Sequence, residues 1–308
     1  LRSMSASDPA CKYSLRDYYI MSAANACCGG AMNNDYVNVC NLKSVLRQGC
    51  RGIDLEIYNI GGKPVVSVGT NSSNYYVKNT LNFVSFDDVM SVLKNYGFSS
   101  ATAPNPTDPI ILHLRIKSND PLVYSSMVAT FKAFSASLLG KEYSFEYGGK
   151  NLGAVPLLQL SGKIVVVVDR KDPVFVSNQE FMEYVNMTSS SVMMRALPYR
   201  DVVGTPDLNE LQTFNKQQMS VCTPDLNGNP SGIVLREAGV QMQCFAWQLA
   251  DQSQAEANAF FNGGGYAFAL KPERLRYVET TIPTPTAQNP AMSYAPKKIS
   301  SPYYSFEI

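Results

Sequence analysis

Residues 162–169 read GKIVVVVD, and five successive aliphatic side chains, Ile164 to Val168, form the centre of this stretch. Five residues are enough for a strand and far fewer than the ~20 that cross a bilayer. A strand that is apolar at every position has no polar face for solvent, which is typical of parallel strands covered on both sides. The stretch therefore predicts a buried strand of a parallel sheet, with Asp169 at its carboxyl end.

Two more strands are expected upstream of this one. Residues 51–60 (RGIDLEIYNI) and 108–117 (DPIILHLRIK) both have strand character. Because side chains alternate between the two faces of a strand, Asp54 and Glu56 should point to the same side. The sequence thus places two carboxylates together on one strand.

Two helices are expected between these strands. Residues 85–98 have a helical apolar stripe, and Ser85 can cap the first turn together with Asp88. Residues 120–140 predict a second helix that stops at Gly140. Alternation of strands and helices along one long chain indicates parallel βα units, either in an open sheet or closed into a barrel.

Composition excludes several classes of protein. The 308 residues carry 26 basic and 25 acidic side chains, and the net charge of +1 argues against binding to nucleic acid. No apolar run is long enough for a transmembrane segment, and we identify no signal peptide. Seven cysteines without a C-x-x-C pair, and a single histidine, make a zinc site improbable and favour free thiols in an intracellular reducing compartment.

The chain divides into one large domain and a tail. A polar stretch at 172–192 separates a first half (about 11–171) from a second half (about 190–276) of a domain that spans 1–276. Residues 277–308 contain five prolines without periodicity and predict an extended tail. This tail ends in apolar side chains that we expect to pack onto the domain or to bind a protein partner: Tyr303, Tyr304, Phe306 and Ile308.

Several motifs of the chain occur in an order that resembles the phosphoinositide-specific phospholipases C. In the first half these are YYIMSAAN (18–25), GCRGIDLE (49–56), KPVVSVG (63–69), DPIILHLR (108–115) and VPLLQLSGKIVVV (155–167). In the second half they are AGVQMQCFAWQ (238–248) and NGGGYAFALKPERLR (262–276). The resemblance covers roughly 13–276. It implies an α/β fold, namely a distorted (β/α)8 TIM-type barrel of the PLC-like phosphodiesterase class.

The resemblance also implies where the catalytic residues should be. The family's two catalytic histidines match Ala24 and Val68, neither of which can carry a proton. The family reaction needs one group to remove a proton and one to donate a proton, and each such group is typically worth 10²–10⁴-fold in rate. The only histidine of the chain is His113, which we expect to be a core or barrel-lining residue. We therefore expect a catalytically inactive member, a pseudoenzyme.

The metal site implied by the resemblance is altered as well. The family's metal-binding asparagine matches Asn25, and two of its acidic ligands match Asp54 and Glu56. The third acidic ligand matches Arg115. Because calcium prefers six to eight oxygen ligands, we expect no metal here and a salt bridge from the guanidinium to the two acids instead. The alternative is that Arg115 points away and the acids bind water or a weakly held calcium ion.

The residues that would hold the substrate phosphates are mostly replaced. Two lysines of the family fall near Val167 and Asp169. The stretch RALP at 195–198 resembles the family's Arg-x-Tyr-Pro, so that its phosphate-binding arginine matches Arg195 and its tyrosine matches Leu197. Lys163 and Arg195 remain as candidate anion-binding residues.

These observations predict a catalytically inactive phospholipase-C-like protein that serves as a structural or binding component of a larger assembly, such as a virus particle. One alternative is a phosphoric diester hydrolase or lyase of altered chemistry, with Asp54 and Glu56 as acid and base. Another is a non-catalytic binder of phosphorylated or sugar ligands at Arg115, Lys163 and Arg195.

Overall fold

The computed structural model describes most of the chain as two compact units, Leu1–Tyr277 and Val278–Ile308. The described residues are 1–30, 34–69, 76–225, 228–279, 285–286, 289 and 292–308. Each unit is described by itself below.

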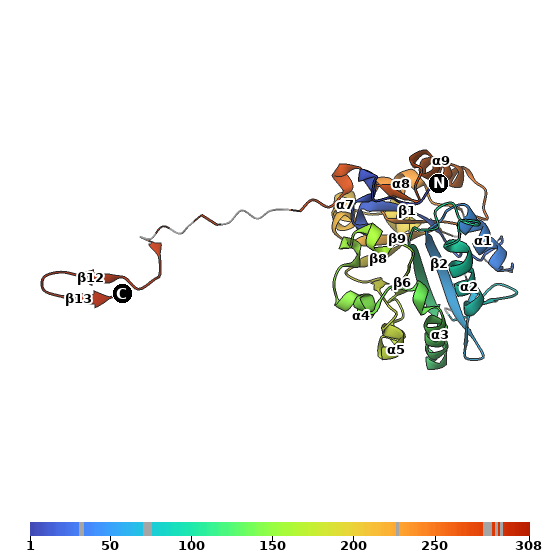
Figure 1. The fold of residues 1–308 in the computed structure, drawn as a ribbon, viewed down its shortest axis with the longest axis horizontal. Coiled ribbons are helices and arrows are strands. Elements are labelled where there is room, and N and C mark those ends of the chain that lie inside the picture. Colours follow the sequence, from blue (N-terminus) through green and yellow to red (C-terminus); the bar gives the residue numbers. More distant parts are fainter. Residues whose placement is uncertain (31–33, 70–75, 226–227, 280–284, 287–288, 290–291) are drawn as a thin grey trace. The chain divides into compact units, whose positions relative to one another are not determined.

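Eight parallel strands form a nearly closed barrel in the first unit (Figure 1). They follow one another around the barrel as β7 (Met187–Ser189), β6 (Ile164–Asp169), β5 (Ile110–Lys117), β2 (Gly52–Ile60), β1 (Tyr18–Ala23), β10 (Met242–Phe245), β9 (Met219–Thr223) and β8 (Met194–Pro198). The end strands β7 and β8 contact each other without joining the ladder. The barrel architecture expected from the sequence is therefore confirmed.

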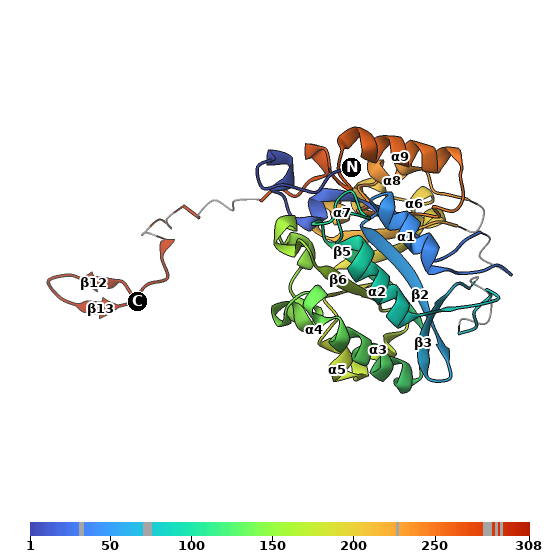
Figure 2. The same ribbon diagram turned by 45° about the vertical axis from the view of Figure 1, so that its right-hand side comes forward.

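Three short strands extend the sheet beyond the barrel. β11 (Phe268–Leu270) runs antiparallel to β1. β3 (Lys63–Ser67) pairs antiparallel with β2, and β4 (Val84–Ser85) pairs with β3. Figure 2 shows the hairpin of β2 and β3 projecting past the barrel wall beside α3 (Pro121–Ala133).

Helices cover the outer side of the strands (Figures 1 and 2). Besides α3, these are α1 (Val39–Arg47), α2 (Phe86–Gly97), α4 (Ser144–Gly148), α5 (Gln179–Met182), α6 (Tyr199–Val203), α7 (Leu208–Gln217), α8 (Gly232–Glu237) and α9 (Gln252–Gly264). Short 3-10 turns lie at Pro9–Cys11, Leu15–Asp17, Ser135–Ser137, Lys141–Tyr143, Leu152–Ala154, Leu157–Leu160, Pro173–Ser177 and Glu273–Leu275. No helix within the described residues is long and apolar enough to cross a membrane.

The strand expected at 164–169 is present, and every residue of β6 is buried. It pairs in parallel with β5 on one side and β7 on the other, so both of its edges are hydrogen-bonded. Helix α2 begins where the sequence predicts, because the Ser85 hydroxyl accepts a hydrogen bond from the Asp88 amide. These local signals are strong enough to fix both elements.

One expectation about an element boundary was wrong. Helix α3 ends at Ala133 and not near Gly140, because Leu138 turns extended and forms a bridge with Ile164 at the start of β6. A contact with a distant strand therefore decides the local structure there. The stretch 172–192, expected to separate the two halves, contains the barrel strand β7.

The second unit contains a two-stranded antiparallel hairpin of β12 (Lys298–Ser300) and β13 (Ser305–Glu307). All six strand residues are exposed, and the rings of Tyr304 and Phe306 stack with their centroids 5.7 Å apart. The sequence predicted an extended tail here and not a hairpin.

Candidate functional site

The strand registry brings acidic and basic side chains to the same level inside the barrel. Asp54 of β2 lies beside His113 of β5, and Glu56 lies beside Arg115 one step further toward the carboxyl ends of the strands. Asn25 follows β1, the neighbouring strand, with a left-handed φ of 44°. Catalytic residues of such barrels lie at this end of the strands, so this is the candidate site.

The Arg115 guanidinium is the centre of the site. Its Nε and Nη2 donate to the two oxygens of Asp54 at 2.9 and 2.6 Å, and its Nη1 donates to Glu56 Oε1 at 2.6 Å. Nη2 also donates to Asn25 Oδ1 at 3.2 Å. This is the bidentate geometry that makes arginine–carboxylate pairs strong and directional.

The attraction between these charged groups is strong because the site is largely buried. The Arg115 side chain is 17% exposed, whereas Asp54 is fully buried. Burial acts to raise the pKa of Asp54, but the charge of Arg115 and the hydrogen bond from His113 outweigh it and hold the pKa well below its usual value. Burial likewise acts to lower the pKa of Arg115, and the charges of Asp54 and Glu56 raise it well above its usual value. Both groups are therefore charged at all ordinary pH values.

A second layer of hydrogen bonds lies beneath the guanidinium. His113 Nδ1 lies 2.7 Å from Asp54 Oδ1, and its Nε2 lies 2.8 Å from Ser189 Oγ of β7. Ser189 also donates to Asp169 Oδ1 at 3.3 Å. The imidazole is completely buried, so it belongs to the barrel interior. Sequence reasoning did not find Ser189, because it lies in a three-residue strand without an apolar pattern.

The positions that match the family's histidines are apolar and buried. Ala24 follows β1 and Val68 follows β3, and each is exposed by no more than 2%. Val167, which matches a lysine of the family, is fully buried in β6. Leu197 packs against a smaller apolar cluster in the second half of the barrel.

The two candidate anion-binding residues are not part of this site. Lys163 immediately precedes β6, at the opposite end from Asp169, and its Nζ donates to the Ala136 carbonyl at 2.7 Å. Arg195 of β8 forms a bidentate pair with Glu210 of α7, with distances of 2.9 and 2.6 Å, and lies 3.9 Å over the Phe214 ring. Its guanidinium is thus committed to a helix that packs outside the strands.

One lysine that the sequence analysis did not single out, Lys117, lies near the guanidinium instead. Lys117 is the last residue of β5, two positions after Arg115, and is almost fully buried. Burial lowers the pKa of Lys117; the charge of Glu56 opposes this, while Arg115 and Lys171 reinforce it. The alternation of strand side chains could have placed Lys117 on the same side as Arg115.

The acidic groups do not fit a calcium ion. Each oxygen of Asp54 already accepts from Arg115, and Glu56 Oε1 does the same. Glu56 Oε2 accepts from the Tyr58 hydroxyl at 2.6 Å and from the Gly69 amide at 2.8 Å. Calcium needs six to eight oxygen ligands, and here every carboxylate oxygen has a donor. In the part of the chain that the structure describes, no group of three or more His, Cys, Asp or Glu side chains is placed to hold a metal.

Solved structures share the fold at low sequence identity. L. pealei PLC21 and S. officinalis PLC21 both align with a TM-score of 0.68 and 18% identity, over 86% and 88% of this chain. The chain spans only 38% and 39% of those two proteins. A calcium-dependent phosphoinositol-specific phospholipase C from Pseudomonas sp, in a myoinositol complex, aligns with a TM-score of 0.54 and 14% identity, over 85% of this chain and 97% of its own.

Family comparison gives the same assignment from the sequence. No curated protein matches this chain. The family model for the phosphatidylinositol-specific phospholipase C X domain matches residues 11–170, which is 160 of the 308 residues. This match contains β1, β2, β5 and β6, which carry or precede most of the site described above. The chain therefore belongs to the phosphatidylinositol-specific phospholipase C X-domain family.

Proposed function

We propose that this protein is a catalytically inactive member of its family. The observation that carries the proposal is the Arg115 guanidinium, which contacts Asp54, Glu56 and Asn25 together. By the family resemblance these three residues would hold a metal ion. A permanent side-chain cation supplies positive charge there, but it leaves no ligand position open to a substrate oxygen.

The proton chemistry is missing in the same region. The family's two histidines correspond to Ala24 and Val68, and neither side chain titrates. His113 is buried with both ring nitrogens in hydrogen bonds, to Asp54 and Ser189. General acid–base catalysis requires a group within hydrogen-bond reach of the substrate, which this imidazole does not offer.

Phosphatidylinositol cleavage measured with and without calcium tests this proposal. We expect no release of inositol phosphate above that of heat-inactivated protein. Ala24→His with Val68→His should also be inactive, whereas adding Arg115→Glu to that pair should give calcium-dependent cleavage. Arg115→Glu alone serves as the control and should be inactive. Activity of the unaltered protein, or of the double histidine variant, would contradict the proposal.

We further propose that the barrel serves as a structural or binding component of a larger assembly, such as a virus particle, in an intracellular reducing compartment. The terminal hairpin supports this role, because its strand residues are exposed and include Ile299 and Phe306. No disulfide joins the described cysteines, which agrees with a reducing environment. Identifying the proteins that co-purify with the chain from its native source tests the role directly. Recovery of the chain alone would argue against it.

One observation favours a second candidate function, the binding of a phosphorylated ligand without turnover. Lys117 lies two positions after Arg115 on β5 and is buried, and its charge interacts with those of Arg115 and Lys171. Calorimetric titration with inositol phosphates tests this candidate. Lys117→Met with Lys171→Met should abolish any binding, while Lys163→Met, at the other end of β6, should leave it unchanged.

A further inference from the structure

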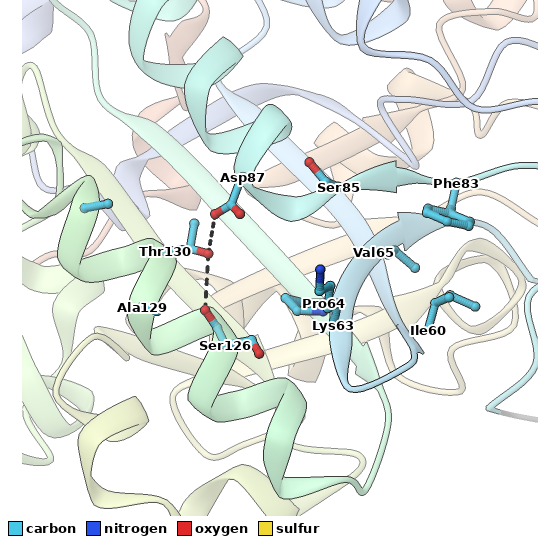
Figure 3. Close-up of a pocket in the computed structure, with 11 residues that line it drawn as sticks. Ile60, Lys63, Pro64, Val65, Phe83, Ser85, Asp87, Ser126, Ala129 and Thr130 are labelled. Carbon is cyan, nitrogen blue, oxygen red and sulfur yellow. Dashed lines mark hydrogen bonds between the residues drawn. The ribbon is translucent and has the colours of Figure 1, made fainter.

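A groove of about 650 Å³ lies on the side of the barrel, away from the candidate site. Figure 3 shows that the β2–β3 hairpin forms one wall and helix α3 the other, with the start of α2 at one end. Its lining on the hairpin side is Ile60, Lys63, Pro64, Val65 and Phe83. Ser85 of β4 pairs with Val65, Asp87 lies at the α2 end of the groove, and the α3 wall is lined by Ser126, Ala129, Thr130 and Ala133.

The two walls differ in shape. On the hairpin side, Ile60 and Phe83 are 40% and 47% exposed, although both are large apolar residues. On α3 the lining side chains are small and recur at helical spacing, at positions 126, 129, 130 and 133. Each molecule therefore presents partly exposed large apolar side chains on one wall and small side chains on the other.

The two charged residues of the groove come from different elements. Lys63 lies on the hairpin, and Asp87 lies in the first turn of α2 (Figure 3). The Thr130 hydroxyl donates to Asp87 Oδ1 at 2.5 Å and fixes the orientation of this carboxylate. No ion pair joins Lys63 or Asp87 to an oppositely charged residue among the described parts of the chain.

We propose that this groove is the interface of a symmetric dimer, in which a second copy of the chain is the occupant. A two-fold axis makes each contact occur twice, so that Lys63 of one copy faces Asp87 of the other and the reverse. The same operation places Ile60 and Phe83 of each copy against the small residues of the other copy's α3. A single molecule thus carries both halves of a complementary surface, in charge and in shape.

This occupant suits the groove better than a small molecule does. Pockets of this volume can hold small ligands, but such pockets are concave and enclose most of the ligand surface. Here Ile60 and Phe83 are large apolar residues that stay partly exposed, and aromatic residues such as Phe83 are enriched at protein interfaces. The inference is independent of the catalytic proposal, because none of these residues belongs to the candidate site.

Sedimentation equilibrium of the full chain over a concentration series measures the dimer dissociation constant. Lys63→Glu and Asp87→Lys each turn two attractive pairs into repulsive ones, and each should raise the constant by about tenfold or more. The combined Lys63→Glu/Asp87→Lys variant restores opposite charges across the axis and should return the constant to within about threefold of the original. Phe83→Asp should weaken the dimer without rescue by either charge change.

Lys12→Glu is the matched control, since it reverses an exposed lysine that does not line the groove. Thermal unfolding of every variant separates loss of dimer from loss of fold. Three results would overturn the proposal: a monomer at every concentration, a dimer that the single reversals do not weaken, or a double reversal as weak as the single ones.

Discussion

Arg115 illustrates how one residue can change the chemistry of a site without disturbing the fold around it. Taking a guanidinium and two carboxylates out of water is costly, and the cost is recovered only when geometry and hydrogen bonding are nearly complete. Here the guanidinium makes four hydrogen bonds, and both acids have further donors. The hydrogen bonds of the cluster and its immediate neighbours therefore offset the cost of burying these charges.

Removing this guanidinium should be strongly destabilising. Arg115→Ala leaves Asp54 and Glu56 buried without their cation, and we expect a loss of about 3–5 kcal/mol in the free energy of unfolding. Millimolar calcium should recover part of this loss, because a cation that binds only the folded state stabilises it. Urea denaturation with and without calcium measures both effects. An equal calcium-dependent gain in the unaltered protein would contradict the prediction.

Lys271 should make the free energy of unfolding change with pH in the range from about 7 to about 10.4. It is 1% exposed, and its Nζ donates to the Asn215 carbonyl at 2.9 Å. Burial lowers the pKa of Lys271 to about 7. The charge of Arg16 also lowers this pKa, whereas the charge of Asp17 raises it. The ordinary value in an unfolded chain is about 10.4. Between these two values the unfolded chain binds the proton more tightly, so stability rises with pH across this window.

Lys271→Met removes that penalty and should raise the melting temperature most near pH 7. The gain should shrink as the pH rises toward about 10.4, above which the lysine is neutral in both states. The Asn215 carbonyl keeps a donor, because Gln241 Nε2 also reaches it at 2.8 Å. Lys132→Met, at an exposed position of α3, is the matched control and should show no such trend. A loss of stability in Lys271→Met that is the same at every pH would contradict the prediction that burial lowers the pKa of Lys271.

The sequence predicts some site residues well and others not at all. Side-chain alternation along a strand correctly groups Asp54 with Glu56, because that periodicity is a property of the backbone. It does not reveal the hydrogen bond from Ser189, which depends on the packing of β7 against β6. Nor does it reveal that Arg195 faces α7, because the position of Glu210 is set by a helix 15 residues away.

At the scale of single elements, local sequence signals predict an element end correctly where a nearby side chain forms a hydrogen bond with the backbone groups at that end. Helix α2 begins at its predicted cap because the Ser85 hydroxyl accepts a hydrogen bond from the Asp88 amide, which has no acceptor within the helix. The end of α3 could not be predicted, since Leu138 leaves the helical path to meet Ile164 of another element. Contacts between distant segments override local propensity at such points.

The cap of α2 gives a direct test at this scale. Ser85→Ala leaves the Asp88 amide without its acceptor at 3.1 Å and should cost about 0.5–2 kcal/mol of stability. Ser85→Thr should retain most of the stability, because its hydroxyl can still accept from the Asp88 amide and donate to the Asp88 carboxylate. Ser125→Ala, on the exposed side of α3, should stay within about 0.5 kcal/mol. Equal losses from Ser85→Ala and Ser125→Ala in urea denaturation would show that the cap contributes nothing specific.

At the scale of the whole molecule, the order of motifs predicts more than any single motif does. Parallel strands joined by helices allow few arrangements, and the eight-stranded barrel follows from that order. The second half was harder to delimit, because β7 and β8 are short and do not pair with each other. The terminal hairpin carries no strong strand signal and exposes all of its strand residues.

The boundary between the two units can be tested to a single residue. Tyr277 belongs to the first unit: its amide donates to Asp17 Oδ1 at 2.9 Å, and the Arg16 guanidinium lies 3.8 Å over its ring. Deleting 278–308 should therefore leave the melting temperature of the barrel unchanged, whereas deleting 277–308 should lower its stability by about 1–2 kcal/mol.

An isolated two-stranded hairpin is marginally stable in water, so we expect the deleted segment to be ordered by a partner protein. Both truncations should then lose that partner equally in a pull-down from the native source, and retention of the partner by either one would place its binding site on the barrel.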